Sequence, residues 1–336
     1  MEYASLEQRL AQGYMDMLPS FVPDETAPVS IAEQERFYGI IRSLHQLAYD
    51  EPTLFVKTLH EDDVYPTRYK KGYDKPKLIE DMKKFTKSVD GLLQAMFLMG
   101  RGEGVKLSKS QKDVFARLDM GNLTDLPAAW KWMAAKEGAN IAAFSHCLFD
   151  DNYPYASEIY ARLLGDAAFK KLEKWMLDRG YRRHILHNVT ASDCNLTLTI
   201  ANPKWSGEPP RGGFEYKIRH TGISAQFDFY AKNPAIFGLC IPNGMKPYLE
   251  AFGDMEEGLR AFVVQRTKKC DNCRYCVQTD KTGSRPLAYI NVEFEGRMYP
   301  LCPYFPGYRY SWTCIDDALA DELMRMLSFM DEFMPA

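Results

Sequence analysis

The hydrophobic period of this 336-residue chain changes near Tyr181, and that change constrains the fold more than any other feature. Before Tyr181, apolar residues recur every three or four positions, as they do after the Ser30-x-x-Glu33 helix start. After it, apolar and polar residues alternate in stretches such as 195–201. Strict alternation is typical of antiparallel strands with one solvated or ligand-facing side. The sequence therefore predicts an α+β protein whose N-terminal half is helical and whose second half is an antiparallel sheet.

We accordingly expect two domains, with the boundary at the change of period. Residues 1–180 form a mainly helical domain, and residues 181–336 form a sheet domain that contains a cysteine module (268–314) and a terminal helix. Within the module, Glu295-Gly296 is expected to turn a hairpin. The terminal helix is expected to follow Cys314 and to bury one apolar stripe: Leu319, Leu323, Met326, Leu327 and Met330.

Composition and charge limit the class of protein. The net charge of -3 argues against a nucleic-acid binder that uses its whole surface. The N-terminus lacks the basic start and apolar run of a signal peptide, and no stretch approaches the roughly 20 apolar residues that span a bilayer. We expect a cytoplasmic protein without membrane contact, whose partner is an unknown small molecule or protein.

The cysteines cluster near the C-terminus, where five of the eight lie within residues 270–314. In a reducing cytosol, clustered cysteines are more often metal ligands or redox groups than disulfides. Two-residue gaps let neighbouring thiolates point at one ion, and the predicted hairpin would return later thiols toward it. The candidate metal ligands are Cys270, Cys273, Cys276, Cys302 and Cys314.

Zinc is the favoured metal, because four thiolates in a closed site suit it and need no redox partner. An iron–sulfur cluster is the alternative, since the run of three cysteines matches the opening of the bacterial ferredoxin pattern. Its fourth cysteine-proline would have to be Cys302-Pro303, later than the usual spacing. A third interpretation is that these thiols pack or lie exposed without metal. Which four of the five bind is left open.

The residues around these cysteines carry a resemblance. The segments "CDNCRYCVQTDKTG" and "FPGY", the second before the last helix, resemble a family of uncharacterised proteins from Gram-positive, largely anaerobic bacteria. The resemblance covers roughly the C-terminal third of the chain. It implies a defined module there, and it implies no activity.

The alternating segments also suggest a ligand site lined by aromatic residues with an arginine as a polar handle. Ordinary core packing is the more frequent role of such aromatics. The candidate ligand-binding residues are Tyr216, Arg219, Phe227, Phe229, Tyr308 and Trp312.

Enzyme motifs are lacking in the sequence: there is no phosphate loop, zincin helix or nucleophile elbow. His146 and Cys147 adjoin, but neighbours on a helix point apart, so a catalytic Cys–His pair is not expected there. The basic stretch 68–87, interleaved with tyrosines, is interpreted as a solvated helix start rather than a nucleic-acid site.

These observations lead to one expectation and one alternative. We expect a cytosolic binding or regulatory protein with a structural zinc site. The alternative is a thiol-dependent or iron–sulfur-dependent enzyme.

Overall fold

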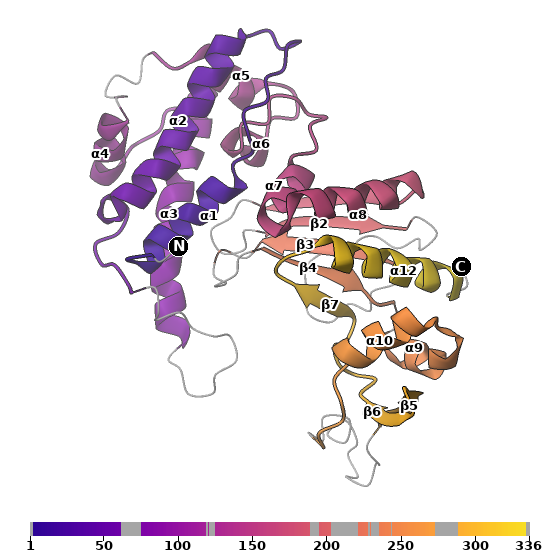
Figure 1. The fold of residues 1–336 in the computed structure, drawn as a ribbon. Helices are drawn as coiled ribbons and strands as arrows, with labels where there is room; N and C mark the ends of the chain where they lie inside the picture. Colours follow the sequence, from indigo (N-terminus) through magenta and orange to yellow (C-terminus); the bar gives the residue numbers. More distant parts are fainter. Residues whose placement is uncertain are drawn as a thin grey trace. The chain divides into compact units, whose positions relative to one another are not determined.

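The fold was examined in a computed structural model (Figure 1). It describes residues 3–61, 75–118, 120, 125–188, 195–202, 221–227, 229, 235–242, 244–272 and 288–333. These residues belong to two compact units. Unit 1 consists of Met1–Ile159, Leu186–Leu196 and Phe227–Pro234, and unit 2 consists of Tyr160–Ile185, Thr197–Gln226 and Ala235–Ala336.

Unit 1 is built mainly from helices. The Phe37 side chain is fully buried, and its ring centroid lies 4.9 Å from that of Phe144 and 5.7 Å from that of Trp130. The Trp130 indole N–H donates to the Met96 carbonyl at 2.7 Å, so the buried ring also satisfies its polar atom. The helices are α1 (Leu6–Met17), α2 (Ile31–Asp50), α3 (Lys75–Gly100), α4 (Lys109–Arg117), α5 (Ala128–Ala135), α6 (Ile141–Ser145) and the first half of α7 (Tyr155–Leu164), with the short 3₁₀ helix η1 (Pro52–Leu54).

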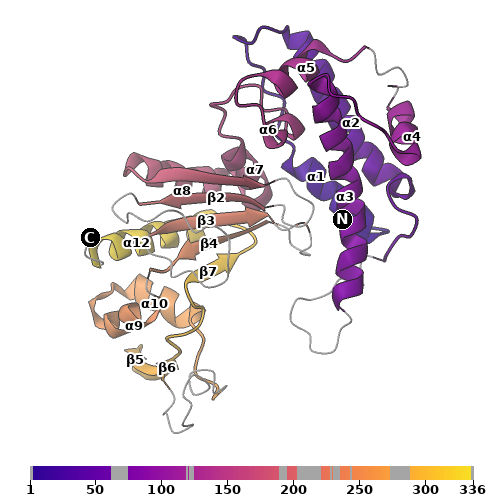
Figure 2. The ribbon, with the colours of Figure 1, turned by 180° about the vertical axis from the view of Figure 1, so that it is seen from behind.

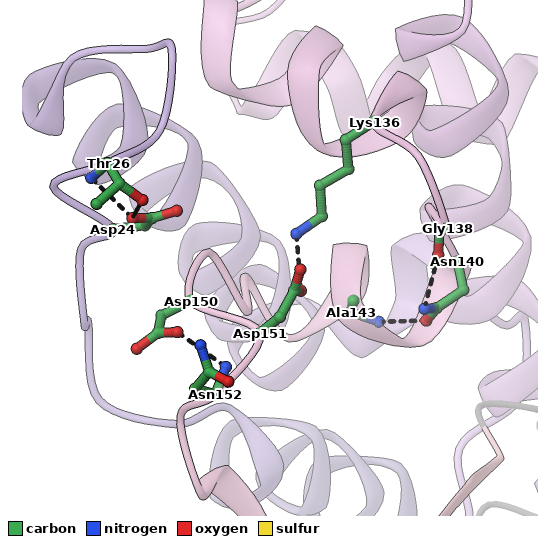
Figure 3. A network of polar contacts seen from close by, with 9 residues as sticks. All are labelled: Asp24, Thr26, Lys136, Gly138, Asn140, Ala143, Asp150, Asp151 and Asn152. Carbon is green, nitrogen blue, oxygen red and sulfur yellow. Dashed lines mark hydrogen bonds and ion pairs between the residues drawn. The ribbon is translucent and has the colours of Figure 1, made fainter.

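Polar contacts fasten the loops around α5 and α6 (Figure 3). The Lys136 ammonium pairs with the Asp151 carboxylate at 2.8 Å, which ties the end of α5 to the loop before α7. The Asn140 side chain accepts a hydrogen bond from the Ala143 N–H at 2.8 Å and so caps α6. These contacts order the loops that close the helical core.

Unit 2 contains a five-stranded sheet in the order β1-β2-β3-β4-β7. Strands β2 and β3 pair antiparallel with Leu198 opposite Ala225, and β4 and β7 pair antiparallel with Leu239 opposite Tyr310. The strands are β1 (Arg182–Asn188), β2 (Asn195–Ala201), β3 (Gly222–Phe227), β4 (Ala235–Cys240) and β7 (Arg309–Trp312). The first residues of β2 and the last of β1 group with unit 1.

Two long helices cover one face of this sheet. Figures 1 and 2 show α8 (Asp166–Asp178) beside α12 (Asp317–Phe333), and Lys171 on α8 pairs with Asp321 on α12 at 2.7 Å. All five apolar residues expected in the stripe of the last helix are buried, so that prediction is confirmed. The Ile315 N–H donates to the Leu164 carbonyl at 2.8 Å, which places the start of α12 against the end of α7.

A second, smaller sheet follows α9 (Lys246–Glu250), the 3₁₀ helix η3 (Phe252–Asp254) and α10 (Glu257–Arg266). It is the antiparallel hairpin of β5 (Ile290–Phe294) and β6 (Arg297–Leu301). Glu295 and Gly296 have φ values of 51° and 69°, and two positive φ values are what a type I′ turn requires. The hairpin predicted at this dipeptide is therefore confirmed.

The α+β class with an antiparallel sheet matches the sequence prediction, and the chain ends its described part in the expected helix. Two points differ. Helix α8 groups with the sheet, although the hydrophobic period changes only after it, because its apolar face packs beside α12 rather than among the other helices. The cysteine-rich metal module is not shown by the described residues. None of the described helices is long and apolar enough to cross a membrane.

The pairing of β4 with β7 can be tested at Gly238. A Cβ added there would lie 2.3 Å from the Tyr310 carbonyl oxygen, so the two strands would have to separate. We expect Gly238→Ala to lower the free energy of unfolding by about 1–3 kcal/mol, as overpacking does. Gly253→Ala is the matched control, because its Cβ would meet no atom within 4 Å. Urea denaturation of both variants measures the difference, and equal losses would contradict the register.

Candidate functional site

The candidate site is a pair of cysteines brought together by backbone pairing. Lys269 and Leu301 form an antiparallel bridge, flanked by hydrogen bonds from the Cys270 N–H to the Pro300 carbonyl (2.7 Å) and from the Cys302 N–H to the Lys268 carbonyl (2.8 Å). The segment before the cysteine run is thereby added to β6 as a third short strand. Cys270 and Cys302, which are 32 positions apart in the sequence, become diagonal neighbours across this bridge.

The register places both thiols on one face. Side chains alternate along a strand, so Cys270 and Cys302, each next to a member of the Lys269–Leu301 pair, point to the face opposite that pair. They are diagonal neighbours, for which Cα atoms lie roughly 7–8 Å apart. Two thiolates at such positions can reach one metal ion, given metal–sulfur bonds of about 2.3 Å. Both side chains are half-buried.

The chain changes direction directly after the first cysteine. Asn272 has a φ of 61°, in the left-handed region that asparagine tolerates better than most residues. It precedes Cys273, which lies outside the described residues, as does Cys276. Among the residues that the structure does describe, no group of three or more histidine, cysteine, aspartate or glutamate side chains could hold a metal.

The fifth candidate ligand lies on a different element. Cys314 is exposed in the connection between β7 and α12. It takes no part in the backbone hydrogen bonds of Cys270 with Pro300 and of Cys302 with Lys268. The structure therefore places Cys270 and Cys302 close together, and the assignment of all five cysteines as metal ligands stays a prediction.

Two lysines flank the cysteine pair. The Lys268 ammonium lies 3.1 Å from the Asp271 carboxylate and 5.1 Å from the centroid of the Phe305 ring. The Lys269 ammonium lies 4.9 Å from the centroid of the Tyr299 ring. The register places Lys269 on the face opposite the thiols, and the Lys268 charge is paired with Asp271.

The opposite face of the same small sheet borders a groove. The groove has a volume of about 530 Å³ and lies between α10 and the β5–β6 hairpin. Lys269 and Glu295 give it one cation and one anion, and the remaining lining is mostly apolar or aromatic. Its lining residues are Ala261, Val264, Gln265, Thr267, Lys269, Phe294, Glu295 and Tyr299.

Of the six predicted ligand-binding residues, none of the four that the structure describes lines this groove. Phe227 and Phe229 are buried in unit 1, where the Phe229 ring centroid lies 4.7 Å from that of Tyr14. Tyr308 is exposed and Trp312 packs on Phe237 with ring centroids 5.5 Å apart, both within unit 2. Tyr216 and Arg219 lie outside the described residues. An aromatic ligand site made of these six residues stays a prediction.

Sequence reasoning missed a buried histidine pair in unit 1. His45 on α2 is 3% exposed, and in the described part of the chain neither of its ring nitrogens has a hydrogen-bond partner. Burial, and then the nearby His146, lower the pKa of His45 to about 3. Burial lowers the pKa of His146 to about 4, against a hydrogen bond of its Nδ1 with the Ala142 carbonyl. The signal was present, because His45 follows Ile41 by four positions on the buried face of a regular helix.

Cys147 follows His146 in the sequence, and its surroundings disfavour the thiolate form. Cys147 is buried with a φ of 51°, and burial raises the pKa of its thiol well above the ordinary value. A protonated, buried thiol is a poor nucleophile. The expectation that His146 and Cys147 are not a catalytic pair stays a prediction.

Comparison with known proteins finds no match for this chain: no family model, no curated protein and no solved structure is similar to it. The geometry of its own residues is therefore the basis for a function.

The histidine pair predicts acid sensitivity. An unfolded histidine titrates near pH 6.5, so between about pH 6.5 and 4.5 the unfolded chain binds protons that the buried, neutral rings do not. Stability is therefore lost as the pH falls through this range, by up to about 1.4 kcal/mol per pH unit for each ring. We expect His45→Leu to remove roughly one proton from that slope, measured by urea denaturation at several pH values. His184→Gln, at an exposed position of β1, should leave the slope unchanged. An unchanged slope in His45→Leu would contradict a neutral buried His45.

Proposed function

We propose that this chain is a cytosolic binding or regulatory protein whose C-terminal module is stabilised by a structural zinc ion. The observation that carries the proposal is the backbone pairing that sets Cys270 and Cys302 on one face. Two half-buried thiols on one face suit a thiolate-bound metal. Sulfur ligands favour zinc among the common divalent metals of the cell. The remaining ligands would come from Cys273, Cys276 and Cys314.

A metal at this position would have a defined structural role. The third strand is attached to β6 through the single bridge between Lys269 and Leu301. A bond from each neighbouring thiolate to one ion would lock that attachment, because metal binding in small modules supplies folding free energy directly. The metal would therefore fix the position of Lys269 against Tyr299.

This role connects the metal to binding. Lys269 and Tyr299 line the groove between α10 and the hairpin, on the face opposite the thiols. A small molecule or a protein segment that occupies this groove would meet an ammonium group, a tyrosine ring and the Glu295 side chain. We infer that the groove is the ligand-binding surface and that the metal keeps its shape.

Metal content and stability should change together in cysteine variants. We expect the purified protein to contain about one zinc ion per chain, and Cys270→Ser and Cys302→Ser each to lose most of it. Melting temperature should fall by several degrees in each variant, since loss of a structural metal removes folding free energy. Mass spectrometry for metals and thermal unfolding measure the two quantities.

Cys240→Ser is the control, because Cys240 is a buried cysteine of β4 in the same unit. It should retain the metal, whatever its effect on stability. A metal-free wild-type protein prepared with zinc present would refute the zinc proposal. Iron and sulfide with absorbance near 400 nm after anaerobic purification would assign the module to an iron–sulfur centre instead.

A further inference from the structure

A second groove of unit 2 lies between helices α8, α10 and α12, and we call it the three-helix groove. The three helices line it with Trp175, Leu259 and Phe329 among others, and its volume is about 360 Å³. Sites for small molecules have volumes of about 300–1,000 Å³. An ion pair between Arg266 of α10 and Glu322 of α12, at 2.7 Å, holds two of the helices together. The groove therefore has walls that are fixed by packing within one unit.

Helix α12 turns one face to the three-helix groove. Arg325, Phe329 and Glu332 all line it, and they follow one another at intervals of four and three residues. Side chains at these intervals lie above one another on a helix. The guanidinium, the ring and the carboxylate are therefore neighbours in space as well as in sequence.

The last turn of α12 is held by hydrogen bonds to the sheet region. The Tyr181 hydroxyl donates to one Asp331 oxygen at 2.5 Å, and the Thr221 hydroxyl donates to the other. Tyr181 precedes β1 and Thr221 precedes β3. Asp331 is thereby occupied, and the next residue, Glu332, supplies the carboxylate that lines the groove.

Two aromatic rings form part of the groove wall, and both are half-buried. Phe329 stacks on Phe333 with ring centroids 5.4 Å apart and ring planes at 9°. The Arg179 guanidinium lies 3.9 Å from the centroid of the Trp175 ring. An indole attracts cations more strongly than any other side-chain ring, and this contact uses that property. Both rings are thus held in place from one side.

The charged residues of the lining do not balance. The Arg325 guanidinium lies 3.8 Å from the Glu256 carboxylate, so these two charges offset each other. Glu332 has no hydrogen bond or ion pair with any residue in the described ranges. The groove therefore combines two aromatic rings with one carboxylate that lacks a counter-charge.

We propose that the three-helix groove binds the trimethylammonium group of an organic cation. Aromatic faces and a carboxylate are the surroundings that such a group prefers. It has no N–H, so it needs no hydrogen-bond acceptor, and the Ser328 hydroxyl is the only hydroxyl in the lining. A primary ammonium has three donors to satisfy and suits this lining less well. Anions are repelled by Glu332. The proposal does not depend on the zinc ion or on the groove beside the hairpin.

The test is calorimetric titration of the full chain with choline chloride at constant ionic strength. We expect saturable binding with a Kd on the order of 1 mM, as suits so small a ligand. Two comparison compounds separate charge from shape. 3,3-Dimethylbutan-1-ol has the shape of choline without its charge, and 2-aminoethanol has the charge without the methyl groups. Each should bind at least about tenfold more weakly than choline.

A peptide probe distinguishes the source of the group. Nα-acetyl-Nε-trimethyllysine methylamide carries the same trimethylammonium group on a peptide unit. If it binds more tightly than choline, the natural ligand is a methylated protein side chain. If it binds equally or more weakly, the natural ligand is a free small molecule. Either result supports a trimethylammonium site.

Variants of the lining should change the affinity in opposite directions. Trp175→Leu and Phe329→Leu should each weaken choline binding roughly three- to tenfold, because leucine is apolar but has no ring face. Glu332→Gln should weaken it roughly two- to fivefold, as loss of an exposed charge does. Arg325→Gln should tighten binding roughly two- to fivefold, because it frees the Glu256 carboxylate.

Glu257→Gln is the matched control. It removes the same charge from an exposed position of α10 that does not line the groove, and the Kd should not change. If Trp175→Leu fails to fold, Arg325→Gln decides, because Arg325 is exposed and its removal leaves the apolar wall intact.

Four results would overturn the proposal. Choline that does not bind at 50-fold above the expected Kd excludes the site. Equal binding of 3,3-dimethylbutan-1-ol shows an apolar groove without preference for a cation. Weaker binding in Arg325→Gln shows that the guanidinium, and not the carboxylate, contacts the ligand. Equal losses in Glu332→Gln and Glu257→Gln show nonspecific attraction.

Discussion

Unit 2 depends on the contact between its last helix and its sheet. The apolar stripe of α12 covers one face beside α8, and the Asp331 carboxylate binds hydroxyls that lie 150 and 110 residues earlier in the chain. The stripe supplies most of the free energy, since burial of several large apolar side chains outweighs a few hydrogen bonds. The two hydroxyls fix the position of the helix end, because they lie just before two different strands, β1 and β3, and both donate to Asp331.

The small sheet of the cysteine module is stabilised in a different way. Its hairpin has a single face against α10, and a two-stranded hairpin alone is only marginally stable. The bridge between Lys269 and Leu301 adds a third short strand, and the same bridge sets two thiols side by side. In so small a sheet, a metal bond would replace the buried core that the hairpin is too short to form. The shape of the groove on the other face would then depend on the bonds between the thiolates and the metal.

The sequence predicted those features that repeat along one element. The helix from Ile31, the stripe of α12 and the Glu295-Gly296 turn each follow from local spacing or from backbone sterics, and each is present. Features that depend on distant partners were harder to predict. The placement of Cys270 next to Cys302 depends on the register between residues 268–270 and β6. No local sequence pattern determines that register. His45, by contrast, was a local signal that was overlooked.

The order of the strands has a consequence for synthesis on the ribosome. Strand β7 pairs with β4 but is made about 70 residues later, after α9, α10 and the hairpin. Until Arg309–Trp312 leaves the ribosome, β4 presents an open, apolar edge, with residues such as Phe237 and Leu239 that end up fully buried. Open edges of this kind invite pairing with other chains. The nascent chain is therefore most prone to aggregation during the interval between its fourth strand and its last helix, when a chaperone that shields strand edges would help it most.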